Sequence, residues 1–458
     1  MLSAIITNES KMFQDGEFSV FDIQPGRYDN SIMIHIGKPF ITEEGDRAFL
    51  KAKVSISDDT AGAYVRAITP ERYRSVFLTD EDYPPAAWKE DGTLWFDVPS
   101  EYSGYLCKER SNAFVVALFW YAMAAGSDIE FEAPMSKRLY DGFTQELMPE
   151  LEKNGFGPVA LKGPVTSEPV RCAGGVVSGM SGGVDSFYTL KCYSSEDVPE
   201  EKRITHLSHY TCSYLFKPGD MEKGMKAMYA DEDAIEAVIL ERIKAIAAQK
   251  GYPLIDTNTN LDRDYYRGGY VFMAMYRYLA CTLALEHLYR LYISSSSGHE
   301  SGLIKASLFV PTQNYEELLC RSLRTETFRY MSSDSEIRTE KIRAIADDEL
   351  FRRYASVCFD TGRNGENCGV CYGCLKTIIP LDLLGKLDGF SESFDLDAYR
   401  RDRGKLFRFL VEFSERPEAD SARHTVHQLL DLANKEKSEA GDMFIRAYES
   451  VTGMRRKA

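Results

Sequence analysis

Hydrophobic positions before residue 110 recur in the short alternating pattern of β-strands. β-branched and aromatic runs are separated by Gly, Pro and Asp, as is typical of strands joined by turns. From Asn112 the pattern predicts a helix, whose apolar stretch from Ala113 to Gly126 is shorter than the roughly 20 residues of a membrane span. A buried helix is therefore expected there. The predicted strands are SIMIHIG, RAFLKAKVSIS, AYVRAIT, RSVFLT, TLWFDVP and IEFEAP, and KRLYDGFTQELMPELEKNG predicts an amphipathic helix ending at Gly155.

The pattern changes after the segment GPVALKGPVTSEPV, which is rich in Pro and Gly and is interpreted as a boundary. Beyond it, strands alternate with helices, which implies a parallel sheet with right-handed crossovers. Helices are expected over residues 231–250 and, as a long apolar helix, over residues 264–290. The tail after residue 384 is charged and predicted to be helical. The strands predicted here are GGVVSGM, ITHLSHY, YPLIDTNTN and LYISSSS.

These patterns predict an α/β protein built on a Rossmann-like parallel sheet. Its 458 residues suit about three domains of ordinary size. Residues 1–165 are expected to form a β-rich α+β accessory domain, and residues 170–384 a second domain that contains the parallel sheet. Residues 385–458 are expected to form a helical C-terminal extension.

Charge and cysteine usage narrow the class of protein. The net charge of −15 argues against broad non-specific binding to nucleic acid or anionic membranes, although it permits a local basic groove. The first residues lack a basic region followed by a long apolar stretch, so no secretory signal is expected and the location is predicted to be cytoplasmic. Six of the ten cysteines are scattered singly, whereas four crowd between Cys358 and Cys374. This distribution indicates a reducing compartment and one metal site.

The turn Ser181-Gly182-Gly183-Val184-Asp185-Ser186 carries the strongest motif. It follows a predicted strand and opens a predicted helix. Consecutive glycines allow backbone N–H groups to point at one spot, and the helix N-terminus adds positive potential, so the turn could cradle phosphate. Ser181 and Ser186 could donate hydroxyl groups, and Asp185 could hold a magnesium ion that bridges phosphates.

Other interpretations of this turn stay open. The Walker pattern G-x-x-x-x-G-K-[ST] does not fit, because no lysine follows the glycines. Gly179 to Gly183 also matches G-x-S-x-G, the nucleophile elbow of α/β-hydrolases, with Ser181 as nucleophile. His299, His424 and His427 would then be available as bases, but none stands in a recognisable triad context. A purely structural turn is the third alternative.

The four clustered cysteines, Cys358, Cys368, Cys371 and Cys374, have metal-ligand spacing. Two-residue gaps let successive thiolates face one ion, and four soft ligands favour a closed, structural zinc site. Two alternatives are an iron–sulfur centre and four buried free thiols. A bacterial ferredoxin pattern would need a fourth cysteine at position 378, which is Ile378.

At these two motifs the sequence resembles a known group of enzymes. SGGVDS is similar to the SGG-x-DS signature of the N-type ATP pyrophosphatases, the PP-loop enzymes of the adenine nucleotide alpha-hydrolase-like fold. Followed by NCGVCYGCLK, it resembles the 7-cyano-7-deazaguanine synthases, over roughly residues 174–384. The resemblance implies that residues 181–186 bind ATP and Mg²⁺, that the cysteines bind structural Zn²⁺, and that His209 lies where this fold meets adenine. SSDSEIRTEKIRAI also resembles the family's helix before the zinc site.

The segments that would bind the acceptor substrate differ from those of that family. Where the synthases have a G-R-N turn, this chain has Tyr266-Arg267-Gly268-Gly269-Tyr270. Where they have Asp-Cys-Arg-Pro near the deazapurine pocket, it has Ser297 to Gly302. Arg267, His299 and Glu300 are the candidate acceptor contacts, the last two because they follow the carboxyl end of a predicted strand.

The expected function is that of an ATP-dependent ligase. It would adenylate a carboxylate or carbonyl oxygen, release pyrophosphate, and let ammonia or an amine displace AMP. The acceptor would be a small deazaguanine-like carboxylate or a protein, as in divergent relatives from anti-phage operons. A homodimer or an operon-encoded partner is expected. The alternatives are a non-catalytic ATP-binding component of such a complex and tRNA thiolation, against which the net charge of −15 counts.

Overall fold

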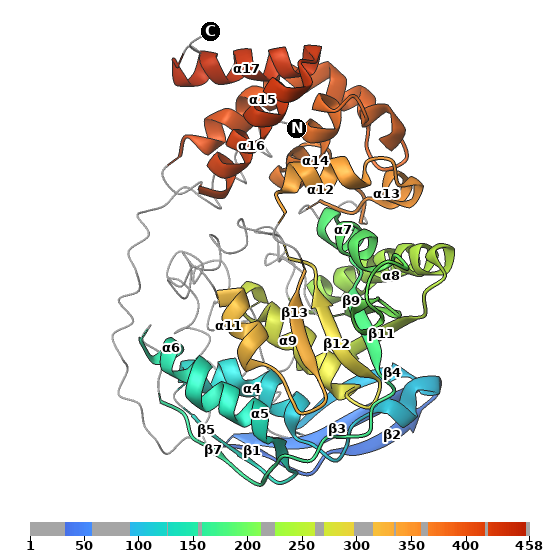
Figure 1. Ribbon diagram of the computed structural model, residues 1–458, viewed down its shortest axis with the longest axis vertical. Helices are drawn as coiled ribbons and strands as arrows, with labels where there is room; N and C mark the ends of the chain where they lie inside the picture. Colours follow the sequence, from blue (N-terminus) through green and yellow to red (C-terminus); the bar gives the residue numbers. More distant parts are fainter. Residues whose placement is uncertain are drawn as a thin grey trace.

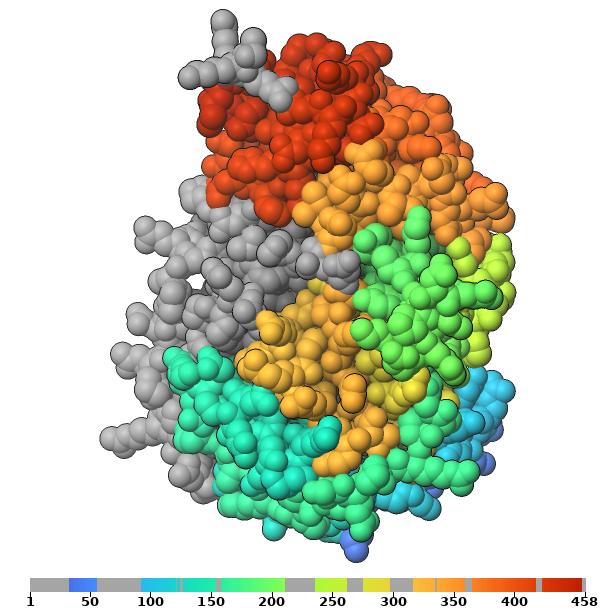
Figure 2. All heavy atoms as spheres, viewed as in Figure 1, coloured from blue at the N-terminus to red at the C-terminus, as the bar shows by residue number. Residues whose placement is uncertain are grey.

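The structure is a computed structural model in which one large sheet connects the N-terminal strands with the parallel strands in the middle of the molecule. Figure 1 shows the N-terminal strands at one end, parallel strands in the middle and the C-terminal helices at the other end, and Figure 2 shows the same order on the surface. The predicted strands AYVRAIT and RSVFLT and the helix end at Gly155 lie outside the described residues. The structure describes residues 33–56, 92–125, 127–153, 158–211, 225–261, 270–296, 315–333, 336–358, 365–416 and 420–454.

Five parallel strands form the centre of the sheet, as the alternation of strands and helices predicts. Their spatial order is β13-β12-β9-β10-β11, and every neighbouring pair is parallel. From β9 the chain moves outward to β11 and then returns to place β12 on the opposite side of β9. The direction of progress therefore reverses between β9 and β12. The strands are β9 (Gly175–Gly179), β10 (His206–Thr211), β11 (Leu254–Thr259), β12 (Tyr289–Ser294) and β13 (Arg329–Ser332).

The N-terminal strands continue this sheet. β4 (Thr93–Pro99) pairs antiparallel with β11, and β3 (Arg47–Ile56) pairs with β4, so that one mixed sheet of eleven strands results. Arg47 on β3 reinforces the junction by bonding both Asp97 on β4, at 2.7 Å, and Asp256 on β11, at 3.1 Å. Hydrogen bonds thus cross the expected boundary near residue 165, while independent folding of residues 1–165 stays a prediction. The remaining strands of this sheet are β1 (Met33–Ile36), β2 (Phe40–Glu44), β5 (Asp128–Phe131) and β7 (Leu161–Lys162).

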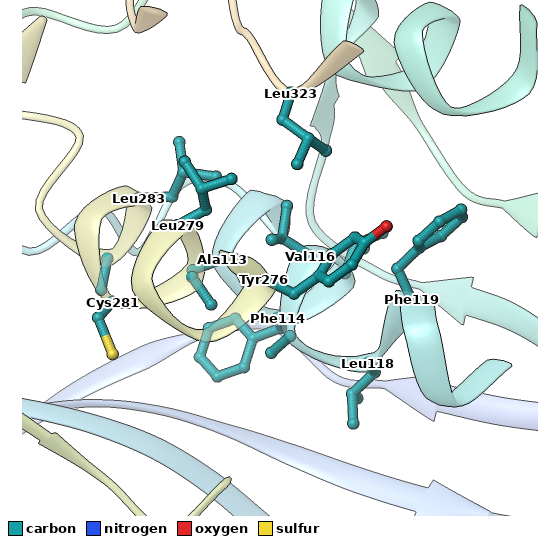
Figure 3. Close-up of a cluster of buried hydrophobic side chains, with 14 of the residues drawn as sticks. Ala113, Phe114, Val116, Leu118, Phe119, Tyr276, Leu279, Cys281, Leu283 and Leu323 are labelled. Carbon is teal, nitrogen blue, oxygen red and sulfur yellow. The ribbon is translucent and has the colours of Figure 1, made fainter. Parts of the chain in front are cut away.

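Helices cover both faces of the parallel strands. Side chains of α7 (Val184–Tyr193) and α8 (Met225–Lys250) share one core with β9, β10 and β12. On the other face, α4 (Asn112–Ala125) and α9 (Tyr270–Ala284) share a core with the N-terminal strands, and Figure 3 shows Phe114, Phe119 and Tyr276 within it. The apolar stretch of α4 is thus a buried helix, as expected. Within the described ranges, no helix is long and apolar enough to span a membrane.

Two predicted helices differ in detail. The long apolar helix predicted to reach residue 290 ends at Ala284, because the backbone turns at Leu285–Leu288 and Tyr289 begins β12. The amphipathic helix predicted from Lys137 is present but contains a π-helical segment, Gly142–Leu147, between α5 (Lys137–Asp141) and α6 (Met148–Lys153). A Cβ atom at Gly142 would lie 1.9 Å from the carbonyl oxygen of Ser322, so only glycine allows α11 (Tyr315–Ser322) to approach this closely.

The C-terminal part is helical, as expected. Its last three helices pack on one another and, through α14, against the core that contains β9. The elements of this part are α12 (Arg338–Ile345), α13 (Glu349–Tyr354), α14 (Tyr372–Leu383), the 3₁₀ turn Leu387–Phe390, α15 (Leu396–Ser414), α16 (Asp420–Glu436) and α17 (Glu439–Thr452). The remaining short elements are β6 (Met135–Ser136), β8 (Val165–Thr166) and the 3₁₀ turns Ser100–Tyr105 and Glu200–Lys202.

Candidate functional site

The glycine-rich turn joins the carboxyl end of β9 to the N-terminus of α7. Gly182 has φ +76°, and a Cβ atom there would lie 3.1 Å from Cβ of Ser356, so the turn requires glycine. The Ser181 hydroxyl accepts a hydrogen bond from Gly183 N at 3.3 Å, and the Ser186 hydroxyl donates to Gly183 O at 2.9 Å. The two serine oxygens are 3.3 Å apart. Both predicted serines therefore stabilise the turn itself.

Asp185, in the first turn of α7, lies between two cations of α12. Its carboxylate oxygens are 2.9 Å from Nζ of Lys341 and 3.3 Å from Nη1 of Arg338. The side chain of Lys341 is 1% exposed and that of Arg338 is 9% exposed. Lys341 also donates to the carbonyl oxygen of Ser296, which follows β12, and Arg338 donates to Thr377 on α14. The sequence predicted Asp185 but not its two partners.

This arrangement favours an anion. Two buried cations face one carboxylate, so the described side chains leave a surplus positive charge, which is costly to bury without a counter-charge. The α7 N-terminus adds positive potential on the same side. The site lies between the carboxyl ends of β9 and β12, where the strand order reverses, and open α/β sheets bind ligands at this position.

A second polar pair lies on β10 and α8. His209 Nε2 contacts a carboxylate oxygen of Glu236, and the two side chains are 9% and 7% exposed. The other oxygen of Glu236 is buried and makes no hydrogen bond to the described part of the chain. It could accept a hydrogen bond from an amino group. Glu236 was not predicted, because a glutamate in an acidic helix gives no sequence signal of burial.

His206 lies at the opposite end of the same strand. His206 is the first residue of β10, and its Nδ1 lies 2.8 Å from the Thr205 hydroxyl. Burial lowers the pKa of His206, which favours the neutral imidazole. It therefore belongs to the amino edge of the sheet, away from the glycine-rich turn.

The four predicted cysteines come together into one cluster that could bind a metal such as zinc. Their sulfur atoms all lie within 4.8 Å of one another, with Cys358 and Cys371 at 3.8 Å and Cys368 and Cys374 at 3.9 Å. Four thiolates about 2.3 Å from a tetrahedral ion would be about 3.8 Å apart. Backbone N–H groups point at the sulfurs, including Cys371 N at 3.2 Å from Cys368 Sγ. Hydrogen bonds from the other three thiols lower the pKa of Cys368, which favours its thiolate form.

Several predicted residues cannot be placed. Arg267, His299 and Glu300 lie outside the described residues. His424 and His427 are on α16, and in the described ranges no histidine hydrogen-bonds Ser181, whose hydroxyl contacts Gly183 and Ser186. The described part of the chain therefore provides no histidine base for Ser181, which the nucleophile-elbow interpretation needs.

No protein-family model, curated protein or solved structure matches this chain.

Proposed function

We propose that this protein is an ATP-dependent enzyme that adenylates a carboxylate or carbonyl oxygen, releases pyrophosphate, and lets an amine or ammonia displace AMP. The observation that carries the proposal is the arrangement of Lys341 and Arg338 around Asp185 at the glycine-rich turn. The anion assigned to the site in this proposal is the triphosphate of ATP, because a glycine-rich turn at a helix N-terminus can cradle phosphate and two buried cations lie beside it.

In this proposal the protein positions charge and supplies no covalent nucleophile. Lys341 and Arg338 would neutralise negative charge on the β- and γ-phosphates. The N–H groups of the turn would fix the orientation of these phosphates. Both cations are held by backbone or side-chain oxygens from β12's end and from α14, so they are already in place when the nucleotide arrives. Such preorganisation stabilises the charge that develops on the leaving pyrophosphate.

The residues present also fit the expected metal ions. Asp185 is a carboxylate at the turn, and its oxygens would become available to Mg²⁺ once phosphate oxygens engage Lys341 and Arg338. Mg²⁺ would neutralise and orient the phosphates. Zn²⁺ would be held by the four cysteines in a closed structural site, because all four positions of a tetrahedral ion are then filled.

The finer assignment follows the sequence resemblance. We propose that the parallel strands adopt the adenine nucleotide alpha-hydrolase-like arrangement, for which the order β13-β12-β9-β10-β11 is suitable, and that the acceptor is a deazaguanine-like carboxylate or a protein. Glu236, one of whose carboxylate oxygens contacts His209, would accept a hydrogen bond at its other oxygen from an exocyclic amino group of the nucleotide or acceptor. Arg267, His299 and Glu300 remain the proposed acceptor contacts.

The test is AMP and pyrophosphate formation from Mg-ATP, ammonium and 7-carboxy-7-deazaguanine. Acceptor-dependent AMP is expected from the wild-type protein, and Asp185→Asn should lower the rate at least about 100-fold with unchanged zinc content and circular dichroism. Asp197→Asn changes an exposed carboxylate that contacts Ser195 beyond α7, so it is the matched control and should react normally. Normal turnover by Asp185→Asn would refute the assignment of the turn. ATP binding without AMP from any acceptor would favour a non-catalytic component.

A further inference from the structure

A second group of metal-binding side chains lies at the opposite edge of the sheet from the glycine-rich turn. Cys107 and Glu109 come from the segment between the first 3₁₀ turn and α4, and His287 from the turn between α9 and β12. One ligand atom from each side chain lies within 4.8 Å of the other two. Because His287 precedes β12, this group sits at the amino end of the strand, whereas Ser296 and the glycine-rich turn sit at the carboxyl ends of β12 and β9.

The hydrogen bonds of His287 fix the orientation of its ring. Nδ1 is 2.7 Å from the carbonyl oxygen of Arg171, which can only accept, so Nδ1 carries a proton and donates. Nε2 is 2.9 Å from a carboxylate oxygen of Glu109, which also only accepts. A neutral imidazole cannot satisfy both contacts. Either a second proton or a cation must therefore lie on the Nε2 side.

A histidine whose Nδ1 is anchored to a backbone carbonyl presents Nε2 in the manner of most metal-bound imidazoles. Backbone hydrogen bonds also hold the segments that carry Cys107 and His287. Cys107 N donates to the Ala284 carbonyl at 2.9 Å, and Ala173 N donates to the His287 carbonyl at 2.8 Å. Three chain segments are thus locked together around the group before any ion binds.

We propose that Cys107 Sγ, the Glu109 carboxylate and His287 Nε2 form a second metal site, distinct from the four-cysteine cluster. A thiolate, a carboxylate and an imidazole are the ligand types that Zn²⁺ accepts, and two negative ligands balance its charge. Three protein ligands leave a fourth position for water. Cys107 is 2% exposed, and burial raises the pKa of its thiol, so an ion must displace a proton when it binds.

A metal ion at this second site would link the N-terminal segment to the parallel sheet. Cys107 and Glu109 precede α4, whereas His287 begins the return into β12. An ion shared by these residues would join the two parts at the amino edge, just as Arg47 joins them through Asp97 and Asp256 within the sheet. The alternative is a protonated His287 paired with Glu109, with Cys107 as an uninvolved thiol.

Metal content of the full-length protein distinguishes these two states. We expect the wild-type chain to bind a second equivalent of zinc beyond the one held by four cysteines, and His287→Gln and Glu109→Gln each to lose or weaken it. Cys192→Ser removes a partly exposed cysteine outside both groups and is the matched control, which should bind like the wild type. A single equivalent in the wild-type chain that His287→Gln retains would overturn the proposal.

Cobalt titration of the wild-type chain tests the second site without relying on variants that could fold poorly. Thiolate-to-cobalt absorption grows with the number of thiolate ligands, so a one-thiolate site adds a weaker signal than the four-cysteine cluster. Two such steps in the metal-free wild-type chain would support the proposal, and one step would refute it. Neither zinc content nor cobalt absorption involves ATP. Absence of the second metal site would therefore not contradict the proposed adenylation, and absence of adenylation would not contradict the second metal site.

Discussion

Ser356 donates its backbone N–H to the carbonyl oxygen of Gly182 at 2.9 Å, which ties the glycine-rich turn to the chain that leads into the cysteine cluster. Cys358 is only two residues further on. Asn367, the residue before Cys368, holds the same stretch by donating to the Ala355 carbonyl at 2.6 Å and accepting from Val357 N at 3.0 Å. A metal bound by the cysteines would therefore also brace the turn proposed to bind phosphate.

Asn367→Ala should weaken both fold and nucleotide binding. It removes three hydrogen bonds, including one to the Ser393 carbonyl at 3.0 Å, and unpaired backbone groups of this kind cost about 1–3 kcal/mol. We expect a lower free energy of unfolding by denaturant and weaker ATP binding by calorimetry. Asn112→Ala is the matched control, because Asn112 bonds Glu286 and Ser136 far from the turn. Asn112→Ala should destabilise the fold yet leave ATP affinity unchanged. If Asn367→Ala and Asn112→Ala changed ATP affinity equally, Asn367 would not support the turn.

Lys341→Met should reduce ATP affinity about tenfold or more. The substitution keeps the volume but removes a buried charge that contacts Asp185 and the Ser296 carbonyl, and hydrogen bonds to charged groups contribute about 1.5–3 kcal/mol. Lys435→Met removes a lysine of α16 whose side chain is 64% exposed, and it should bind ATP normally. If Lys341→Met bound Mg-ATP as tightly as the wild type, this cation would not belong to a phosphate site.

Cys374→Ser should release the metal and lower the melting temperature. Cys374 is fully buried in the cluster, and closed zinc sites contribute directly to folding energy. Cys281→Ser places the same polar change in the buried core of α9 and controls for destabilisation alone. Metal analysis should find zinc lost only from the Cys374 variant. Retention of a full complement by Cys374→Ser would exclude this cysteine as a ligand.

Phe119→Ala should show that the N-terminal strands and the parallel sheet unfold together. Phe119 is completely buried and stacks on Phe143 at 4.1 Å, with Tyr276 of α9 at 6.0 Å. Truncating such a residue costs about 3–5 kcal/mol. The three tryptophans lie at positions 88, 95 and 120, so their fluorescence reports on the N-terminal third while circular dichroism reports on the whole chain.

If the chain unfolds as one cooperative unit, the unfolding transitions followed by fluorescence and by circular dichroism should shift equally in Phe119→Ala. Phe444→Ala is the matched variant, because Phe444 is equally buried in the core of the C-terminal helices. If its effect appeared only in circular dichroism, and tryptophan fluorescence kept the wild-type transition, residues 1–165 would be an independent domain as the sequence predicts.

Local signals explain most of what the sequence could predict. The strand, glycine turn and helix around Ser181 and Asp185 are contiguous, and so is the cysteine spacing, because each depends on residues close together in the chain. The end of α9 was misplaced because Leu285, Leu288 and Tyr289 continue its apolar pattern while being buried in a turn and a strand. Apolar periodicity cannot separate these cases.

Long-range partners could not be predicted in the same way. Lys341 meets Asp185 across 156 residues and Asp97 accepts from Arg47 across 50, and neither separation leaves a local pattern. Arg338 and Lys341 stand three apart, so they share one helical face, which was the available signal. A cation pair on a helix more often faces solvent, and only the fold shows that these two are buried.

The pairing of β4 with β11 has a consequence for how the chain can be divided. β11 is the outermost of the parallel strands, and without β4 its Asn258 and Thr259 would present unpaired backbone groups at an open edge. Such edges template intermolecular pairing. Removing the first 165 residues would also strip α4 from the apolar surface of α9. We therefore expect a fragment that begins after residue 165 to aggregate, because both the edge of β11 and the apolar surface of α9 would be uncovered.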